Sequence, residues 1–236
     1  MKWHLDNMAV EVRYSDEFLY WDKTGLIAKE LVGILPSFAL VRASPSETNL
    51  ASAKMGFTCR YSYKVLNLIQ DCSFIDNPVL YKLAAPICAL IFDTIQVTNI
   101  ARLGNRLTYH CCFETVEEAA EQFRRITEGK DLGCNFLSTS EDPRLQSMSL
   151  NEISLNFKGD KLGVRLNIKT GKQVFNINGV VPEELRRHIP EDKAILILDI
   201  DVFTISGMSV EGLAVDEFLK SNTKLVETRI FPLVEV

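Results

Sequence analysis

Histidine is scarce in this chain, with three among 236 residues. His4, His110 and His188 lie far apart, and none has the spacing to another histidine or to a cysteine that metal sites use. The sequence also lacks a phosphate-binding glycine loop, a Rossmann fingerprint, a G-x-S-x-G elbow and an H-E-x-x-H helix. We therefore expect no catalytic residue, no metal and no cofactor, and an enzyme is the less favoured class.

Long hydrophobic runs are absent as well. The most apolar stretch, KLAAPICALIFDTIQV, contains Pro86 and Asp93 and is too short to cross a bilayer. The N-terminal stretch has Asp6 and Glu11 where a signal peptide needs a continuous apolar segment. We expect a protein without a membrane segment that stays in the cytoplasm.

The six cysteines do not form a C-x-x-C pair, which argues against a redox or zinc motif. We expect them to be reduced thiols that serve as small hydrophobic side chains. A thiol nucleophile next to His110 is a weaker alternative, because neighbours on a strand, such as His110 and Cys111, point to opposite faces.

The composition is that of a soluble globular protein, with 47% apolar and 24% charged residues. The length suits one domain with a sizeable core. The net charge of −5 disfavours non-specific binding to nucleic acid, although it leaves room for a local basic face.

Hydrophobic periodicity predicts an alternation of strands and helices. In residues 8–14, Met8, Val10, Val12 and Tyr14 alternate with polar residues, which is typical of a half-buried strand. Thr115 and Glu118 form a capping box at the start of a helix. The expected strands cover 8–14, 38–44, 53–63, 65–74, 99–113, 151–158, 161–169 and 193–206, and the expected helices cover 22–35, 80–97, 115–129, 181–190 and 209–233.

This order predicts an α+β fold in one domain, residues 1–236. We expect a long twisted antiparallel sheet with helices packed on one face and a polar opposite face. The element order of residues 1–98 recurs in residues 99–236, so we also predict a pseudo-duplication into two β-α-β(n)-α halves.

Arg102, Gly104 and Arg106 share one face of the strand over residues 99–113. Two guanidinium groups about 7 Å apart suit a phosphate or carboxylate ligand, and the glycine leaves room for a close approach. The alternative is cross-strand ion pairing on a solvated sheet face, which we favour.

Asp199 and Asp201 share one face of the late strand LILDIDVFTI. Paired carboxylates can hold a divalent ion, but the motif lies mid-strand and lacks a third carboxylate at a suggestive spacing. Ion pairing with Arg102 and Arg106 is the favoured alternative.

The polar face would collect Arg102, Arg106, Arg165 and several lysines, with asparagines between them. Such a face could follow a nucleic-acid backbone, but aromatic residues that would stack on bases are not interleaved with these charges. A protein interface or a solvated face is favoured instead.

The chain resembles a sporadically distributed family of uncharacterised prokaryotic proteins. The resemblance rests on the strand AVEVRY, on R-x-G-x-R at Arg102, Gly104 and Arg106, and on the late strand LDIDVF with Asp199 and Asp201. Residues 107–109 depart from the usual Tyr-x-Asn of the family. The resemblance implies a bacterial or archaeal source and an association with phage defence or mobile elements, but no mechanism.

These observations predict a non-enzymatic binding protein that uses its polar sheet face or sheet edges to contact a protein partner or a copy of itself. The alternative is a sensor or enzyme that holds an anionic small molecule at Arg102 and Arg106. Single-stranded nucleic acid is a third, weaker prediction.

Overall fold

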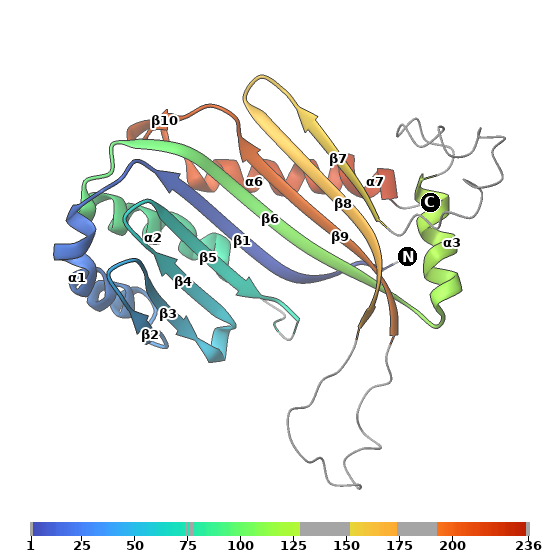
Figure 1. The fold of residues 1–236 in the computed structure, drawn as a ribbon, viewed down its shortest axis with the longest axis horizontal. Helices are drawn as coiled ribbons and strands as arrows, with labels where there is room; N and C mark the ends of the chain where they lie inside the picture. Colours follow the sequence, from blue (N-terminus) through green and yellow to red (C-terminus); the bar gives the residue numbers. More distant parts are fainter. Residues whose placement is uncertain (1, 74, 76–77, 128–151, 174–192, 235–236) are drawn as a thin grey trace, which may run out of the picture.

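The computed structural model describes residues 2–73, 75, 78–127, 152–173 and 193–234 (Figure 1). The helical turn predicted over 181–190, together with His188 and Cys134, lies outside these ranges.

The first half of the chain forms five strands and two long helices. The elements are β1 (His4–Tyr14), α1 (Leu19–Ile34), β2 (Ala39–Ala43), β3 (Thr48–Ser52), the 3₁₀ turn η1 (Ala53–Met55), β4 (Phe57–Tyr61), β5 (Val65–Asp71) and α2 (Leu80–Ile95).

The second half repeats the pattern of a long strand, a helix, a series of strands and a helix. Its elements are β6 (Asn99–Phe113), α3 (Val116–Thr127), β7 (Glu152–Lys158), β8 (Leu162–Gln173), β9 (Lys193–Thr204), β10 (Met208–Ser209), the 3₁₀ turn η2 (Val210–Gly212), α6 (Val215–Leu225), the π-helical segment η3 (Val226–Ile230) and α7 (Phe231–Val234).

All described strands belong to one antiparallel sheet, so the predicted α+β fold with a long antiparallel sheet is confirmed. The strand order is β2-β3-β4-β5-β1-β6-β9-β8-β7, and β10 pairs with β6. In each half, the first strand therefore pairs with the last long strand of that half. The halves meet where β1 pairs with β6 at the centre of the sheet.

One face of the sheet is covered by helices and the other is open (Figure 1). Helices α2, α6 and α7 lie behind the sheet in this view, and their apolar residues form one core with the inward side chains of the strands. Met8, Val10, Val12 and Tyr14 of β1 all point into this core, as their alternation predicted. Among the described residues, no helix combines the length and the apolar character that crossing a membrane requires.

A bulge at the start of β6 changes which residues face the core. Arg13 pairs with Arg102, whereas the next residue of β1, Tyr14, pairs with Ile100, which leaves Ala101 as the extra residue. Regular alternation along the expected strand 99–113 predicts that Ile100 shares the polar face with Arg102; this prediction is wrong, because the bulge leaves Ile100 buried.

The β7–β8 hairpin differs in register from a two-residue turn at Gly159-Asp160, which the expected strands over 151–158 and 161–169 imply. Lys158 lies opposite Gly163 rather than Lys161, and Phe157 lies opposite Val164. Two more residues than expected separate the paired residues Lys158 and Gly163. Because side chains alternate between the two faces of a strand with a period of two, this shift leaves each side chain on its predicted face.

Two further boundaries differ from the sequence predictions. The strand predicted over 53–63 is β4 alone, and a separate strand, β3, precedes the turn η1. The closing helix begins at Val215 rather than Ser209, and Leu219, Val226 and Ile230 supply its buried face. The predicted capping box is confirmed in part. Thr115 Oγ1 accepts a hydrogen bond from the Glu118 N–H at 3.1 Å. The Glu118 carboxylate, however, accepts a hydrogen bond from the Glu114 N–H rather than from the Thr115 N–H.

Two buried asparagines lie in the layer between sheet and helices. Asn105 of β6 donates from Nδ2 to the Tyr81 hydroxyl of α2 at 3.0 Å. Asn222 of α6 is fully buried, and neither its Oδ1 nor its Nδ2 has a hydrogen-bond partner among the described residues. An unpaired buried amide costs stability, because it has lost its hydrogen bonds to water without replacement.

Replacing Asn222 with leucine, which has the same side-chain branching, should therefore raise the free energy of unfolding by about 1–3 kcal/mol. Urea denaturation followed by circular dichroism measures the change. Asn105→Leu is the matched control and should destabilise, because it removes a hydrogen bond to the Tyr81 hydroxyl. A clear loss of stability in Asn222→Leu would contradict the description of this amide as unpaired.

Candidate functional site

The central strands bring the charged residues of the predicted site into cross-strand rows on the open face. In one row Glu11 of β1 lies opposite Gly104 of β6, which lies opposite Phe203 of β9. In the next row Arg106 lies opposite Asp201, which lies opposite Arg165 of β8. Strand pairing therefore places residues that are up to 99 positions apart in the sequence directly opposite each other.

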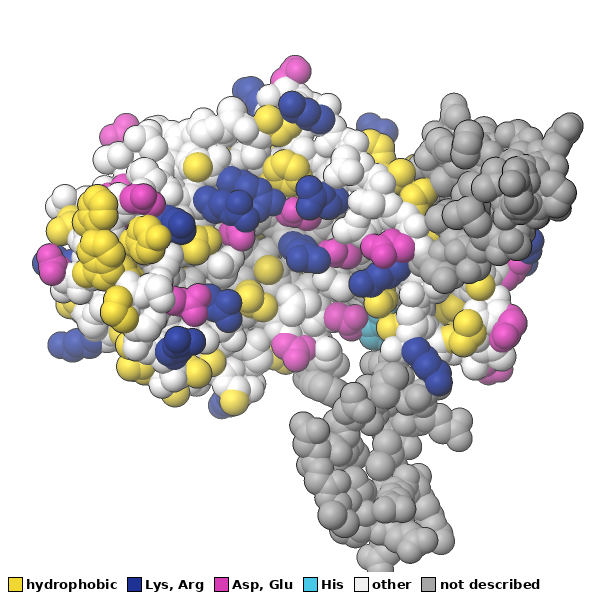
Figure 2. All heavy atoms as spheres, viewed as in Figure 1, with side chains coloured by type: hydrophobic (Ala, Val, Ile, Leu, Met, Phe, Trp, Pro, Cys, Tyr) yellow, Lys and Arg dark blue, Asp and Glu magenta, His cyan; other side chains and the backbone are white. Residues whose placement is uncertain are grey.

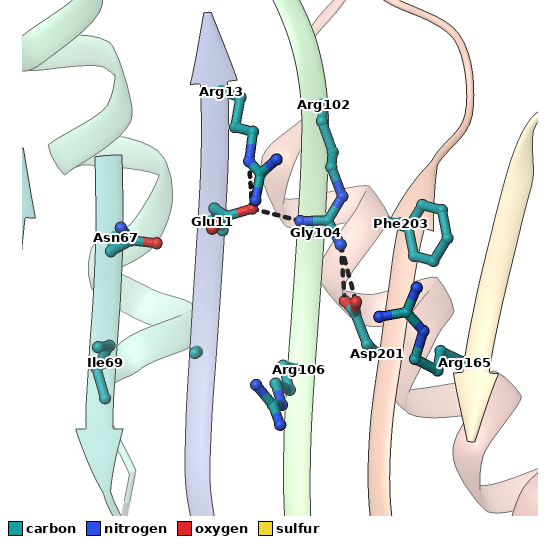
Figure 3. Close-up of a pocket in the computed structure, with 11 residues that line it drawn as sticks. Glu11, Arg13, Asn67, Ile69, Arg102, Gly104, Arg106, Arg165, Asp201 and Phe203 are labelled. Carbon is teal, nitrogen blue, oxygen red and sulfur yellow. Dashed lines mark hydrogen bonds and ion pairs between the residues drawn. The ribbon is translucent and has the colours of Figure 1, made fainter. Parts of the chain in front are cut away.

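Gly104 makes room for the side chain of Arg102, which belongs to the same strand. A Cβ atom at position 104 would lie 3.1 Å from Arg102 Nη1 and 3.2 Å from its Cζ. The Arg102 guanidinium group thus lies across the glycine, as Figure 3 shows. We expected this gap to admit a ligand or another chain, whereas the arginine of the motif occupies it.

The Arg102 guanidinium group joins carboxylates from the two halves of the chain. Its Nη2 donates to Asp201 Oδ2 at 2.8 Å and Oδ1 at 3.1 Å, and its Nη1 donates to Glu11 Oε1 (Figure 3). It also stacks on Phe203, with 4.8 Å between Cζ and the ring centroid. The Phe203 ring in turn covers Gly163, where a Cβ atom would lie 2.6 Å from the ring.

Arg106 pairs with the other carboxylate of the D-x-D strand. Its Nε and Nη2 donate to the two oxygens of Asp199, each at 2.7 Å, in a two-point contact. The favoured alternative of the sequence analysis, ion pairing between these arginines and aspartates, is what the structure contains. Among the described residues, no group of three or more His, Cys, Asp or Glu side chains could hold a metal ion.

The two aspartates differ in their electrostatic surroundings. Burial acts to raise the pKa of Asp199, but the hydrogen bonds and charge of Arg106 hold that pKa below its ordinary value. Burial raises the pKa of Asp201, and the charges of the neighbouring arginines oppose that shift without cancelling it. The pair with Arg106 therefore stabilises the ionised form of Asp199.

These side chains border a hollow of about 540 Å³ on the open face. Its charged lining consists of four arginines and two carboxylates, so the formal charge of the lining is positive. Figure 2 shows the corresponding group of Lys and Arg side chains near the centre of this face. The charged residues of the hollow are Arg13, Arg102, Arg106, Arg165, Glu11 and Asp201.

Some donors of the hollow remain available to a ligand. Arg165 uses its Nε for a hydrogen bond to Asn156 Oδ1 at 3.1 Å, and Arg106 uses Nε and Nη2 for Asp199. Within the described ranges, the terminal nitrogens of Arg165 and the Nη1 of Arg106 have no hydrogen-bond partner in the protein. Because Arg106 and Arg165 flank Asp201 in one row, these donors lie on both sides of the same carboxylate.

The described cysteines provide no activated nucleophile. Cys59, Cys72, Cys88 and Cys111 are free and buried, while Cys112 is exposed. Burial raises the pKa of Cys72 to about 11 and that of Cys88 to about 12, so both are protonated at neutral pH. The expectation of small hydrophobic thiols fits the four buried residues and is wrong for Cys112.

Comparisons with known proteins do not assign the chain to a family. No family model matches the sequence, and no curated protein matches it. The resemblance to the sporadically distributed prokaryotic family therefore stays a prediction.

Two of the charged residues in this site were not among the predicted site residues. Glu11 and Arg13 belong to the AVEVRY strand, whose alternation places them on the polar face, but their pairing with β6 depends on the strand order. Arg165 was assigned to the polar face, yet its place opposite Asp201 depends on the hairpin register. The face of the sheet on which each residue lies could be predicted from the sequence, but its neighbours on the adjacent strands could not.

Arg102→Met should lower the free energy of unfolding by about 1–3 kcal/mol, because it leaves Asp201 and Glu11, which are 21% and 27% exposed, without their main partner. Adding Asp201→Asn should recover part of this loss, which a double-mutant cycle in urea would measure. Arg13→Met is the control: Arg13 contacts the same Glu11 but is 58% exposed, so its loss should change stability by less than about 0.5 kcal/mol. Equal effects of both substitutions would contradict the central role of Arg102.

Asp199→Asn should destabilise the protein by about 1–2 kcal/mol at pH 7. Because the folded-state pKa of Asp199 is lowered, its contribution is fully present above the unfolded-state pKa and is lost as the pH falls through the folded-state pKa. The difference from the unsubstituted protein should thus be constant from pH 7 to 5 and shrink below about pH 4. Urea denaturation at several pH values tests this, with the exposed Asp160→Asn as control; a difference that grows on acidification would contradict it.

Proposed function

We propose that this chain is a non-enzymatic binding protein that receives an anionic partner on the open face of its sheet. The observation that carries the proposal is the hollow, where four arginines outnumber the two carboxylates of the lining together with Asp199, which pairs with Arg106. Guanidinium groups suit carboxylate and phosphate oxygens, and their planar donors give such contacts a defined direction.

The arginines differ in the exposure and the partners of their side chains, and these differences support the proposal. Arg102 is 22% exposed and is held by Glu11 and Asp201, so it organises the site more than it contacts a partner. Arg106 is 61% exposed and Arg13 is 58% exposed, so both can reach an incoming anion. Arg165 completes this set from β8, on the far side of Asp201.

The volume of the hollow favours one second candidate. About 540 Å³ is within the range of small-molecule sites, so a sensor for a small molecule that carries phosphate or carboxylate groups would use the same arginines. The open, helix-free setting of the hollow suits a larger partner better, and a protein partner or a second copy of this chain remains part of the proposal.

We also propose a cytoplasmic location and a prokaryotic source. The five described cysteines are all free, which fits a reducing compartment. The source, and the association with defence or mobile elements, rest on the resemblance of the R-x-G-x-R and D-x-D strands to the prokaryotic family.

The proposal is tested by titrating the protein with inorganic tripolyphosphate at low salt, using calorimetry. Arg165→Gln should weaken binding about tenfold, equal to about 1.4 kcal/mol, because it removes terminal nitrogens that have no partner among the described residues. Arg229→Gln is the matched control, since Arg229 is exposed on the helical side of the chain and should leave affinity unchanged. Failure of tripolyphosphate to bind at low salt, or equal losses in both variants, would overturn the proposal.

A further inference from the structure

Three aromatic side chains form an exposed patch beside the first turn of α1. Phe18 and Trp21 are 66% and 49% exposed, and their ring centroids lie 5.4 Å apart. Trp21 also contacts Tyr63, with 5.9 Å between centroids. We call Phe18, Trp21 and Tyr63 the aromatic patch. Large aromatic rings in contact with one another are seldom left in water unless they contact a partner.

Hydrogen bonds hold the Trp21 ring and the backbone at Tyr63 in place. The indole Nε1 of Trp21 donates to the Pro45 carbonyl at 2.7 Å, and the Glu17 N–H donates to the Tyr63 carbonyl at 2.8 Å. A fixed aromatic surface loses little conformational entropy when a flat group stacks on it, which favours binding.

The aromatic patch is linked to the arginine hollow through the residues that precede β5 and through Arg13 of β1. Tyr63 directly precedes Lys64, whose carbonyl accepts a hydrogen bond from the Tyr14 N–H, and Lys64 Nζ lies 5.2 Å from the Tyr63 ring centroid. The next strand residues, Val65 and Arg13, are paired, and Arg13 is paired with Arg102. Figure 2 shows this layout, with hydrophobic side chains at the α1 end of the face and basic side chains toward its centre.

A ligand that covers both regions must offer flat apolar rings and anionic groups in close succession. Single-stranded nucleic acid has this composition, since its bases stack on aromatic side chains and its phosphates bind arginine and lysine. We propose that the aromatic patch and the arginine hollow together bind single-stranded nucleic acid, with bases on Trp21 and phosphates at Arg13 and Arg165. This inference rests on the proposed function, because it names the anionic partner of the same face.

The sequence pattern of this face showed no aromatic residues interleaved with its charges that could stack on bases. This lack was the main argument against nucleic acid. The patch supplies them from Phe18, Trp21 and Tyr63, which precede or follow the strands and so were not visible as an interleaved pattern. The net charge of −5 still limits binding to a local contact. With three or four phosphates contacted, the logarithm of affinity should fall with the logarithm of salt concentration with a slope of roughly −2 to −3.

The test uses Trp21 fluorescence in a Trp3→Phe background, since Trp3 and Trp21 are the two tryptophans of the chain. The probes are a 12-nucleotide oligo(dT), a 12-nucleotide oligo(U) and polyglutamate, which carries charge without bases. We expect the oligonucleotides to quench Trp21, with the stated salt slope, and polyglutamate to leave the emission unchanged. One oligonucleotide binding more tightly than the other assigns DNA or RNA within the same proposal.

Affinities of variants are measured by fluorescence anisotropy of labelled probes. Trp21→Ala should weaken oligonucleotide binding about 5- to 150-fold, the effect of losing one stacked base, without weakening polyglutamate binding. Leu26→Ala is the matched control, because Leu26 is 47% exposed on α1 outside the aromatic patch, and it should change neither affinity. Circular dichroism verifies that each variant is folded.

The remaining outcomes separate this inference from the proposed function. If polyglutamate binds as tightly as the oligonucleotides, or if Trp21→Ala weakens both equally, the partner is an acidic protein surface: the inference is overturned and the proposed function stands. If tripolyphosphate, polyglutamate and both oligonucleotides all fail to bind at low salt, both are overturned.

Discussion

The contact of Arg102 with Glu11 and Asp201 is the interaction on which the open face depends. It joins β1, β6 and β9, and so connects the two halves of the chain on the face that no helix covers. The guanidinium group reaches both carboxylates because Gly104 leaves the surface of β6 free for it. The lack of a side chain at position 104 thus has a structural role, because it lets the Arg102 side chain lie along the strand to which it belongs.

This contact also explains why the remaining arginines differ in role. Asp201 and Glu11 are occupied by Arg102, and Asp199 is occupied by Arg106. The donors of Arg165 and one nitrogen of Arg106 are left over, so this positive charge lies on both sides of β9, on the flanking strands β8 and β6. In the proposed function, the internal ion pairs fix the geometry of the site, and the guanidinium nitrogens that they leave unpaired would contact the anionic partner.

Much of the architecture was predictable because strand alternation and helix periodicity are local properties of the sequence. The inward side of β1 and the pairing of Arg102 and Arg106 with the aspartates followed from alternation and charge. The burial of Ile100 did not, because a bulge is fixed by the partner strand rather than by the strand that carries it. The hairpin register at Gly163 also depended on a neighbour, since Phe203 must cover this glycine.

The candidate site was less predictable than the fold, since it is made by strands that are distant in sequence. Arg13 and Arg165 each had the correct facing, but the strand order that brings them to one hollow is a property of the whole sheet. The sequence indicated the aromatic patch even less clearly than it indicated the arginine hollow. Trp21 belongs to a helix whose apolar residues suggest a core face, and its exposure depends on how that helix is seated beside the turn at Pro45.

The central position of β1 has a consequence for biosynthesis. The ribosome releases this strand long before β6, one of its two neighbours, which begins only at Asn99. Until β6 has left the exit tunnel, one side of β1 presents unpaired backbone amides and carbonyls, the kind of edge that joins other chains. The first half therefore has an open sheet edge during synthesis, and this edge is closed only when β6 pairs with β1.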